Sequence, residues 1–394
     1  MAMPRVAVVG GSLAGLTAAL VLRDAGCGVD VYERSRAPLS GYGAGIVVQP
    51  ELSRYFLERT ELTLERISVP STAIKYYDAA RGTLIGEVEA DWRYTSYNAL
   101  YRGLLRAYGY ERYQLGETLT AIEQDANEVR LRFATGRQAR CELAVCADGS
   151  FSTARQLLLG IEPRYAGYVT WRGLAPQGTL SEEAWLFFEG HFTYALLRDG
   201  HLIAYPIPTV SDDVHVVGRS INFQWYWNVP EGEPLDDLMT DRHGVRRPVS
   251  VHADGVQPRW LEELRRRARE RIALAPFVEL IKRAPHPFVT IIADTDVPRM
   301  AIGRACLIGD AAVTGRPHAA AGAAKAAANG WALAEALVAA NGDVHEALQR
   351  WEPRQLRQGR AMLAKVRRMG QLLQSGGPFP PGDPANRFGL PAVD

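Results

Sequence analysis

Three turns along this chain of 394 residues carry residue types suited to binding a dinucleotide. The first turn follows the apolar run 5–9 and consists of Gly10, Gly11, Ser12, Leu13, Ala14 and Gly15. Glycines allow a tight turn, and the helix that follows would point its N-terminus at a pyrophosphate. Glu33, 23 positions after Gly10, ends the next apolar run and is placed to accept hydrogen bonds from ribose hydroxyls. Ser12 stands where the fingerprint usually has its second glycine, and the pattern alone does not separate NAD from FAD.

Two further acid-bearing turns follow apolar runs. The run 143–147 ends at Asp148 and Gly149, and the run 305–308 leads to Asp310. Taken singly, an aspartate after a strand is as often a helix cap as a ligand. The last turn continues into a stretch rich in alanine and glycine that contains Pro317, His318, Ala320, Ala321 and Gly322.

The elements that must hold these turns are predicted to be an α/β arrangement. The runs 5–9, 29–32, 143–147 and 305–308 are typical of buried parallel strands, so a Rossmann-like sheet is expected. Helices are predicted over 98–108, 260–272 and 344–373. A further helix is predicted to begin at residue 13, and another to end at residue 338. Arginines and glutamates intersperse 260–272, which favours a solvated helix face over an anion site. Residues 165–229 are rich in aromatics and predict a separate antiparallel sheet, with a hairpin at Asp199 and Gly200.

Composition limits the partners and the compartment. The net charge of +1 gives no reason to expect nucleic acid or an anionic membrane as a partner. The sequence has no uninterrupted apolar run of about 18 residues, so we expect no membrane span. The four cysteines form no Cys-x-x-Cys pair, which predicts no metal site and favours buried thiols in a reducing cytoplasm.

In this order and spacing, the three turns resemble those of the class A flavoprotein aromatic hydroxylases, the para-hydroxybenzoate hydroxylase-like group. The resemblance covers nearly the whole chain and extends to residues 47–52, 90–97, 165–173, 201–208 and 222–229. It implies non-covalent FAD, with NAD(P)H as co-substrate and O₂ as oxidant. A flavin hydroperoxide would hydroxylate an electron-rich (hetero)aromatic ring, such as a dihydroxypyridine. The sequence is compatible with a homodimer.

The resemblance also implies a division of the chain. Residues 1–70, 96–163 and 293–394 would form the FAD-binding domain, the last segment adding C-terminal helices and a tail rich in proline and glycine. Residues 71–95 and 164–292 would form the substrate domain.

Roles for single residues follow from the same resemblance. Glu33 would hold the adenosine ribose, and Asp310 would accept hydrogen bonds from ribityl or ribose hydroxyls. The expected FAD-binding residues are those of the first turn together with Glu33, Arg34, Gly45, Ile46, Gln49, Leu119, Asp148, Gly149, Asp310, Pro317, Ala320, Ala321 and Gly322. Three positions depart from the family pattern. Ala320 stands in place of a glycine, Asn329 in place of an acidic residue, and Tyr97 in place of an arginine. Arg102 is the candidate substitute for that arginine.

The antiparallel region would line the substrate pocket on the far side of the flavin. The expected ring contacts are Tyr205, Trp225, Trp227 and Pro317, although only half of each strand can face inward. His318 is the candidate base for a ring hydroxyl, because histidine titrates near neutral pH and a helix N-terminus lowers its pKa. Tyr168 and Tyr205 are the next candidates for the same catalytic role.

Two other functions fit parts of the sequence. Residues 225–230 are close to the WxWxIP signature of flavin-dependent halogenases, and Lys75 invites comparison with their catalytic lysine. Val229 in place of isoleucine and the much greater usual length of halogenases count against that function. The second alternative is a non-catalytic FAD-binding protein, which ring-accelerated NADH oxidation would exclude.

Overall fold

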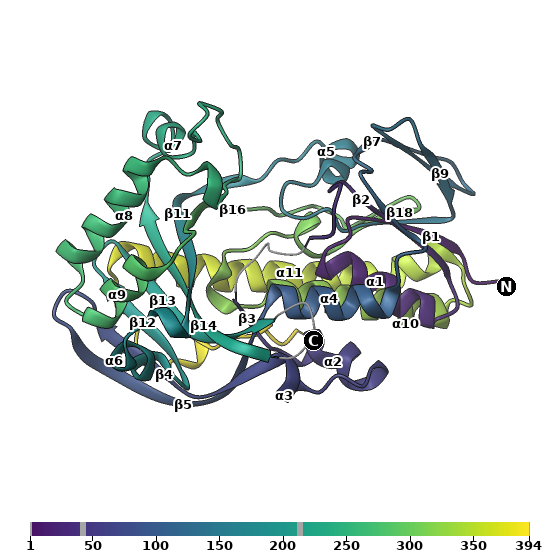
Figure 1. The fold of residues 1–394 in the computed structure, drawn as a ribbon. Coiled ribbons are helices and arrows are strands. Elements are labelled where there is room, and N and C mark those ends of the chain that lie inside the picture. The colour runs from purple at the N-terminus through teal and green to yellow at the C-terminus, as the bar shows by residue number, and fades with distance from the viewer. Residues whose placement is uncertain (1, 40–44, 211–215, 394) are drawn as a thin grey trace.

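The structure is a computed structural model that describes residues 2–39, 45–210 and 216–393. Its first large sheet has six strands in the order β17-β18-β10-β1-β2-β6, and all neighbours are parallel except β17 and β18 (Figure 1). These strands are β1 (Arg5–Val9), β2 (Gly28–Glu33), β6 (Tyr113–Leu115), β10 (Leu143–Cys146), β17 (Ala301–Ile302) and β18 (Ala305–Leu307). The predicted Rossmann-like sheet is confirmed.

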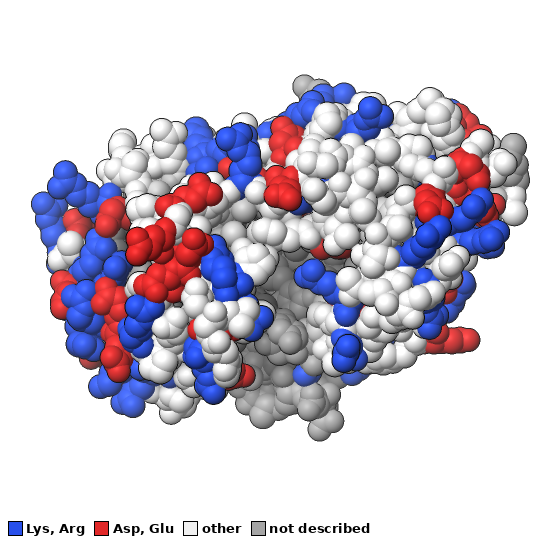
Figure 2. All heavy atoms as spheres, turned by 90° about the horizontal axis from the view of Figure 1, so that it is seen from above, with Lys and Arg blue, Asp and Glu red and all other residues white. Residues whose placement is uncertain are grey.

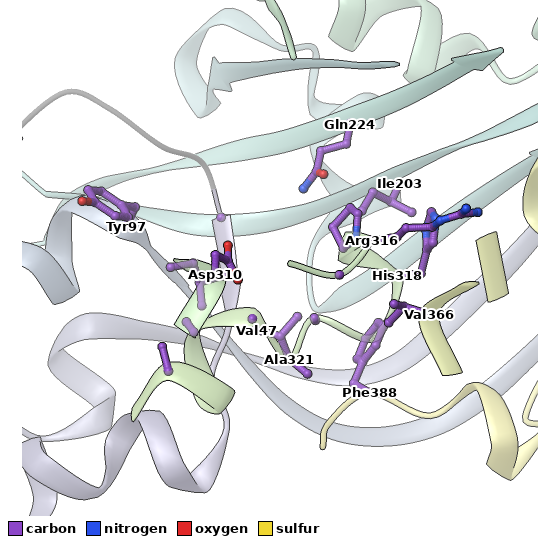
Figure 3. Close-up of a pocket in the computed structure, with 18 of the residues that line it drawn as sticks. Val47, Tyr97, Ile203, Gln224, Asp310, Arg316, His318, Ala321, Val366 and Phe388 are labelled. Carbon is purple, nitrogen blue, oxygen red and sulfur yellow. The ribbon is translucent and has the colours of Figure 1, made fainter. Parts of the chain in front are cut away.

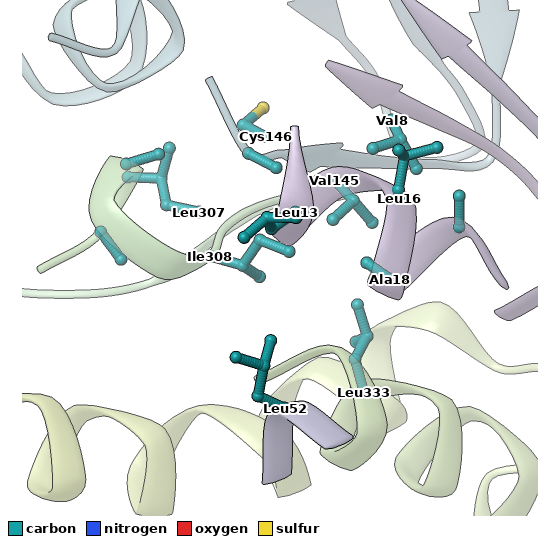
Figure 4. Close-up of a cluster of buried hydrophobic side chains, with 14 of the residues drawn as sticks. Val8, Leu13, Leu16, Ala18, Leu52, Val145, Cys146, Leu307, Ile308 and Leu333 are labelled. Carbon is teal, nitrogen blue, oxygen red and sulfur yellow. The ribbon is translucent and has the colours of Figure 1, made fainter. Parts of the chain in front are cut away.

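Helices α1 (Leu13–Asp24) and α10 (Gly322–Ala339) pack against each other beside this sheet. Figure 4 shows side chains of α1, α10 and α2 (Pro50–Arg59) meeting those of the strands in one apolar cluster. The helices approach closely at Gly330, where a Cβ atom would lie 3.1 Å from the Cα of Ala18. This packing holds the N-terminus of α1 next to the turn after β18.

The second large sheet has nine strands in the order β15-β16-β11-β14-β13-β12-β4-β5-β3, all antiparallel except for β12 and β4. Its strands are β3 (Gly45–Val47), β4 (Ser68–Asp78), β5 (Thr83–Ser96), β11 (Arg164–Pro176), β12 (His191–Leu197), β13 (Gly200–Val210), β14 (Val216–Asn228), β15 (Ser250–Val251) and β16 (Phe288–Asp294). The hairpin predicted at Asp199 joins β12 to β13, with Leu197 opposite Gly200. An antiparallel sheet distinct from the parallel one is confirmed.

The two faces of this sheet have different neighbours. One face packs against α6 (Glu182–Phe188), α8 (Pro258–Arg271) and α9 (Ala275–Arg283) in a closed apolar cluster. The other face turns toward α11 (Val344–Ser375), where Asn228 Nδ2 donates to the carbonyl of Gln374 at 2.9 Å. The first face is therefore covered by apolar side chains, whereas the second face has polar neighbours.

The remaining elements complete the fold. A small antiparallel sheet consists of β7 (Leu119–Gln124), β8 (Val129–Phe133) and β9 (Gln138–Cys141), and the other helices are α3 (Leu64–Ile67), α4 (Tyr97–Tyr108), α5 (Thr153–Leu159) and α7 (Glu233–Leu238). Lys, Arg, Asp and Glu side chains are mixed over the end of the molecule that carries α8 (Figure 2). On α8 itself, Arg266 pairs with Glu263 and Glu270, which confirms a solvated helix face. Within the described ranges no helix is both long and apolar enough to cross a membrane.

Candidate active site

A cavity of about 370 Å³ lies between the two large sheets. Tyr97 and Asp310 lie toward one end, and Gln224, Ile203 and His318 toward the other (Figure 3). The first end is built from turns of the parallel sheet, and the second from side chains of β11, β13 and β14. One end is thus suited to a nucleotide cofactor and the other to a small ring.

A second cavity of about 250 Å³ adjoins the first. Ser12, Ala147 and Gly149 line both cavities, so the two form one elongated space along the first turn. Among the predicted FAD-binding residues, those on the second cavity are Gly10, Ser12, Glu33, Arg34, Leu119, Asp148 and Gly149. Those on the first are Ser12, Leu13, Ala14, Gly45, Ile46, Gly149, Asp310, Pro317, Ala320, Ala321 and Gly322.

The first turn has the close packing that the dinucleotide fingerprint requires. Gly10 has φ +102°, and a Cβ there would lie 2.5 Å from the carbonyl oxygen of Ala147. A Cβ on Gly15 would lie 1.8 Å from the carbonyl oxygen of Gly10. The buried Glu33 carboxylate accepts the N–H groups of Gly11 and Ser35, both at 2.8 Å. A dinucleotide with its ribose toward Glu33 fits this arrangement.

Tyr97 takes part in the site at the position where the family usually has arginine. Its hydroxyl lies 2.7 Å from Ser12 Oγ, and its side chain lines the larger cavity. Arg102, the candidate substitute, lines neither cavity. A tyrosine–serine pair therefore occupies the N-terminus of α1.

The second turn joins a capping role to a place at the smaller cavity. Asp148 Oδ2 accepts the N–H of Ala154 at 3.0 Å, and Oδ1 accepts the Ser152 hydroxyl at 2.5 Å, at the start of α5. Burial raises the pKa of Asp148, partly offset by these hydrogen bonds. The helix-cap interpretation is thus correct, and the residue also lines the space between the turns.

The third turn carries a paired charge. Asp310 Oδ1 lies 3.0 Å from the Nζ of Lys325, which is fully buried on α10. The carbonyl of Ala320 accepts a hydrogen bond from the Gln49 amide, and the alanine has φ +51°, a conformation that favours glycine. Gln49 thus supports the turn without lining either cavity. Asn329, at the position of the family's acid, accepts the N–H of Gly309 at 2.9 Å and so anchors the same turn.

His318 lies at the substrate end. Its Nε2 is 2.8 Å from the Tyr168 hydroxyl, and both residues are buried. Burial, together with the charge of Arg316, lowers the pKa of His318 to about 3, so the imidazole is neutral at pH 7. The expected direction of this shift is confirmed, although desolvation and not the helix N-terminus is its main cause. Tyr168 lies behind His318 and does not itself line the cavity.

The prediction that Trp225 and Trp227 line the substrate pocket is wrong. Side chains alternate along a strand, and Gln224 and Tyr226 of β14 point into the cavity. The two tryptophans therefore point into the apolar cluster on the opposite face, with ring centres 5.2 Å apart. Lys75 on β4 lines neither cavity, so the halogenase-like residues do not form a site here.

The cavity residues that were not predicted include His201, Gln224 and Tyr226. The His201 ring stacks on Tyr226 at 4.3 Å and lies 5.3 Å from His318, whereas Tyr205, which was predicted, stacks on Phe192 at 4.8 Å. The signal that could have identified Gln224 and Tyr226 is the alternation of Asn222, Gln224 and Tyr226 with Phe223, Trp225 and Trp227 along β14. A strand with one polar and one wholly apolar face turns the polar face toward a cavity.

Turns suited to FAD, beside a cavity with room for a small ring at its other end, are typical of a flavin-dependent oxidoreductase acting on a small molecule. A family model described as FAD binding domain-like matches residues 165–294. The 2,6-dihydroxypyridine 3-monooxygenase of Paenarthrobacter nicotinovorans is 52% identical over 390 residues, covering 99% of this chain and 96% of the relative. The 3-amino-4-hydroxybenzoate 2-monooxygenase PtmB3 of Streptomyces platensis is 31% identical, covering 93% and 88%.

The solved structure of 2,6-dihydroxypyridine-3-hydroxylase from Arthrobacter nicotinovorans superimposes with a TM-score of 0.95 and 52% identity, covering 100% of this chain and 98% of that chain. The chain belongs to the class A FAD-dependent aromatic hydroxylases. It is a monooxygenase that uses FAD, NAD(P)H and O₂.

Proposed function

We propose that the enzyme hydroxylates 2,6-dihydroxypyridine or a closely similar dihydroxylated ring, at a carbon next to a hydroxyl. The observation that carries this proposal is the neutral His318, held by Tyr168 at the ring-sized end of the cavity. The 52% identity to a relative named for this substrate supports it. When bound, FAD would supply the chemistry that activates O₂ for transfer of one oxygen atom to the ring, with NAD(P)H as the reductant.

The protein's own contribution begins with holding the cofactor. Glu33 would accept the ribose hydroxyls, and Asp310 would accept a hydroxyl of the ribityl chain or ribose. Ala321, Gly322 and Ala323 at the start of α10 line the first cavity, and the N–H groups of a helix start favour negative charge near them.

The aromatic wall then orients the ring and keeps water out. Tyr205, Tyr226 and Phe192 line the cavity, and Phe388 of the C-terminal tail closes it with its ring 4.9 Å from Phe192. The N–H of Gly389 donates to the carbonyl of Ala319 at 2.9 Å, which fastens the tail to the third turn. Exclusion of water favours oxygen transfer to the ring over release of hydrogen peroxide.

His318 would take the proton of a ring hydroxyl as the ring is attacked. Nε2–H would donate to the Tyr168 oxygen, which leaves the Nδ1 lone pair for the substrate. Removal of that proton raises electron density at the neighbouring carbon. Because the pKa of His318 is low, the imidazolium would release this proton to solvent when the product leaves, which restores the neutral base.

A substrate panel tests the proposal. NADH and NADPH consumption is followed with 2,6-dihydroxypyridine, other dihydroxypyridines and simple phenols, and products are analysed by mass. We expect fastest consumption with 2,6-dihydroxypyridine and a product heavier by one oxygen atom. A product that contains bromine or chlorine contradicts the proposal. So does NADH or NADPH consumption that no ring compound accelerates.

We also propose that the enzyme works in the cytoplasm, because Cys27, Cys141, Cys146 and Cys306 are all unpaired and buried. The homodimer stays a prediction that sedimentation can test. The division into FAD-binding and substrate domains remains a proposal as well.

A further inference from the structure

Arg172 lies on β11 and lines the substrate end of the cavity. Its register partner on β14 is Gln224, another cavity residue. The Nε of Arg172 is buried and has no hydrogen-bond partner, and its guanidinium pairs with no carboxylate in the described parts of the chain. Arg172 is partly buried, so a cation held here without a carboxylate beside it would be stabilised by a ligand that brings negative charge.

The other charged residues that line the cavity, Arg316 and Asp310, have ion-pair partners. Arg316 is paired at 3.1 Å with Asp294, a carboxylate that Arg367 shares, and Asp310 is paired with Lys325 at 3.0 Å. His201 is also neutral at pH 7, because burial lowers its pKa, as it does for His318. Among the acidic and basic side chains that line the cavity, Arg172 is therefore the one without an ion-pair partner in the described parts of the chain.

The position of Arg172 brings this charge to the ring site. Burial raises the pKa values of Tyr205 and Tyr226, and the charge of Arg172 lowers both, so the guanidinium acts on both side chains. The Tyr226 ring also lies 5.3 Å from that of His318. A ring placed against Tyr226 would thus be within reach of the cation and of the candidate base.

We propose that Arg172 anchors the substrate as a ring oxyanion. This inference rests on the proposed function and specifies its substrate class: rings acidic enough to carry one negative charge near neutral pH. One hydroxyl loses its proton to solvent before binding and pairs with the guanidinium; no covalent bond to the enzyme forms. The other hydroxyl stays protonated and faces His318. Arg172 is a binding residue that selects the ionised form of the ring.

The first test uses 4-nitrophenol, whose deprotonated form is coloured, so it reports ionisation whether or not it is a substrate. It is bound to the oxidised, FAD-loaded enzyme without NADH. We expect wild-type protein to bind the coloured phenolate preferentially and to increase the ionised fraction near the phenol's own pKa. Arg172→Gln should lose this increase and bind about tenfold to hundredfold more weakly. Arg172→Lys should retain part of the affinity, because it keeps the charge without the planar fork.

The matched control is Arg219→Gln on β14, since Arg219 pairs with Glu189 on the surface and lies outside the cavity. It removes the same charge and should bind the phenolate as the wild type does. FAD affinity should be unchanged in every variant. The proposal is overturned if wild-type protein binds the neutral phenol or none, or if Arg172→Gln binds and ionises it equally well.

The same titration with 2,6-dihydroxypyridine separates the two proposals. Wild-type protein that binds 4-nitrophenolate but shows no ring-accelerated NADH use with 2,6-dihydroxypyridine refutes the proposed substrate and leaves the anion site supported. Wild-type activity on 2,6-dihydroxypyridine, with unchanged affinity and pH dependence in Arg172→Gln, refutes the anion site alone.

Discussion

The six-stranded sheet contributes to the site through the turns at its strand ends, whereas the nine-stranded sheet contributes through side chains along one face. In the first sheet, the contributing groups are backbone N–H groups and single acids at the strand ends, as at Gly11, Glu33 and Asp310. In the second, the register of a whole strand decides which residues reach the ring. The proposed cofactor contacts are thus concentrated in short motifs, and the proposed substrate contacts are spread over β11, β13 and β14.

The largest effect is expected at the substrate end, from His318→Asn. If His318 is the base, the variant should still bind FAD and be reduced by NADH, but hydroxylate about 10²- to 10⁴-fold more slowly. Rapid-reaction measurements of the hydroxylation step check this. Hydrogen peroxide release should increase, because the ring is less activated. If the variant keeps the wild-type rate and pH profile, His318 has a structural role only. Tyr205 is then the next candidate base, and Tyr205→Phe tests it.

The two faces of β14 should differ in stability. Trp225→Ala opens a void in the apolar cluster behind the sheet and should lower the free energy of unfolding by about 3–5 kcal/mol. Tyr226→Phe on the cavity face removes only a hydroxyl, which donates to Gln224 at 2.7 Å, and should cost about 0.5–1.5 kcal/mol. Denaturant titration compares the two. An equal loss of unfolding free energy in the two variants would mean that the cavity face is packed as tightly as the apolar face.

The cofactor end is tested by Asp310→Ala. Loss of a charge-assisted hydrogen bond should weaken FAD binding by about tenfold to hundredfold while ring affinity changes little. Fluorescence titration of apoprotein with FAD measures this effect. Asp310→Asn keeps the side-chain shape and separates loss of charge from loss of packing. Unchanged FAD affinity in both variants would remove Asp310 from the site.

Acid should destabilise the substrate end, because His318 is buried in its neutral form and takes up a proton more readily in the unfolded chain. Between about pH 6.5 and 3, the unfolded chain protonates His318 while the folded chain does not, so unfolding becomes easier as pH falls. The slope from this group approaches about 1.4 kcal/mol per pH unit. His318→Asn should flatten the fall in stability with acid, as measured by melting at several pH values. An unchanged slope would show that the imidazole is not buried and neutral.

The parallel part of the fold and its cofactor turns could be predicted because they depend on local sequence. Glycine at positions 10 and 15 is required by close backbone contacts, and an acid 23 residues onward is brought back by one strand–helix–strand unit. Tertiary structure adds little to such a motif beyond its confirmation. The exceptions are substitutions such as Tyr97, whose partner Ser12 lies 85 residues away.

Local pattern alone determined the β-rich character of residues 165–229 and the apolar side chains of β14, but not which face meets the ring. That choice belongs to the tertiary structure, since α8 and α9 cover one face while the turn at His318 and the C-terminal tail enclose the other. The low pKa of His318 and the unpaired guanidinium of Arg172 likewise arise from segments distant in sequence. Burial and charge balance depend on every neighbour at once, and spacing along one strand carries no information about them.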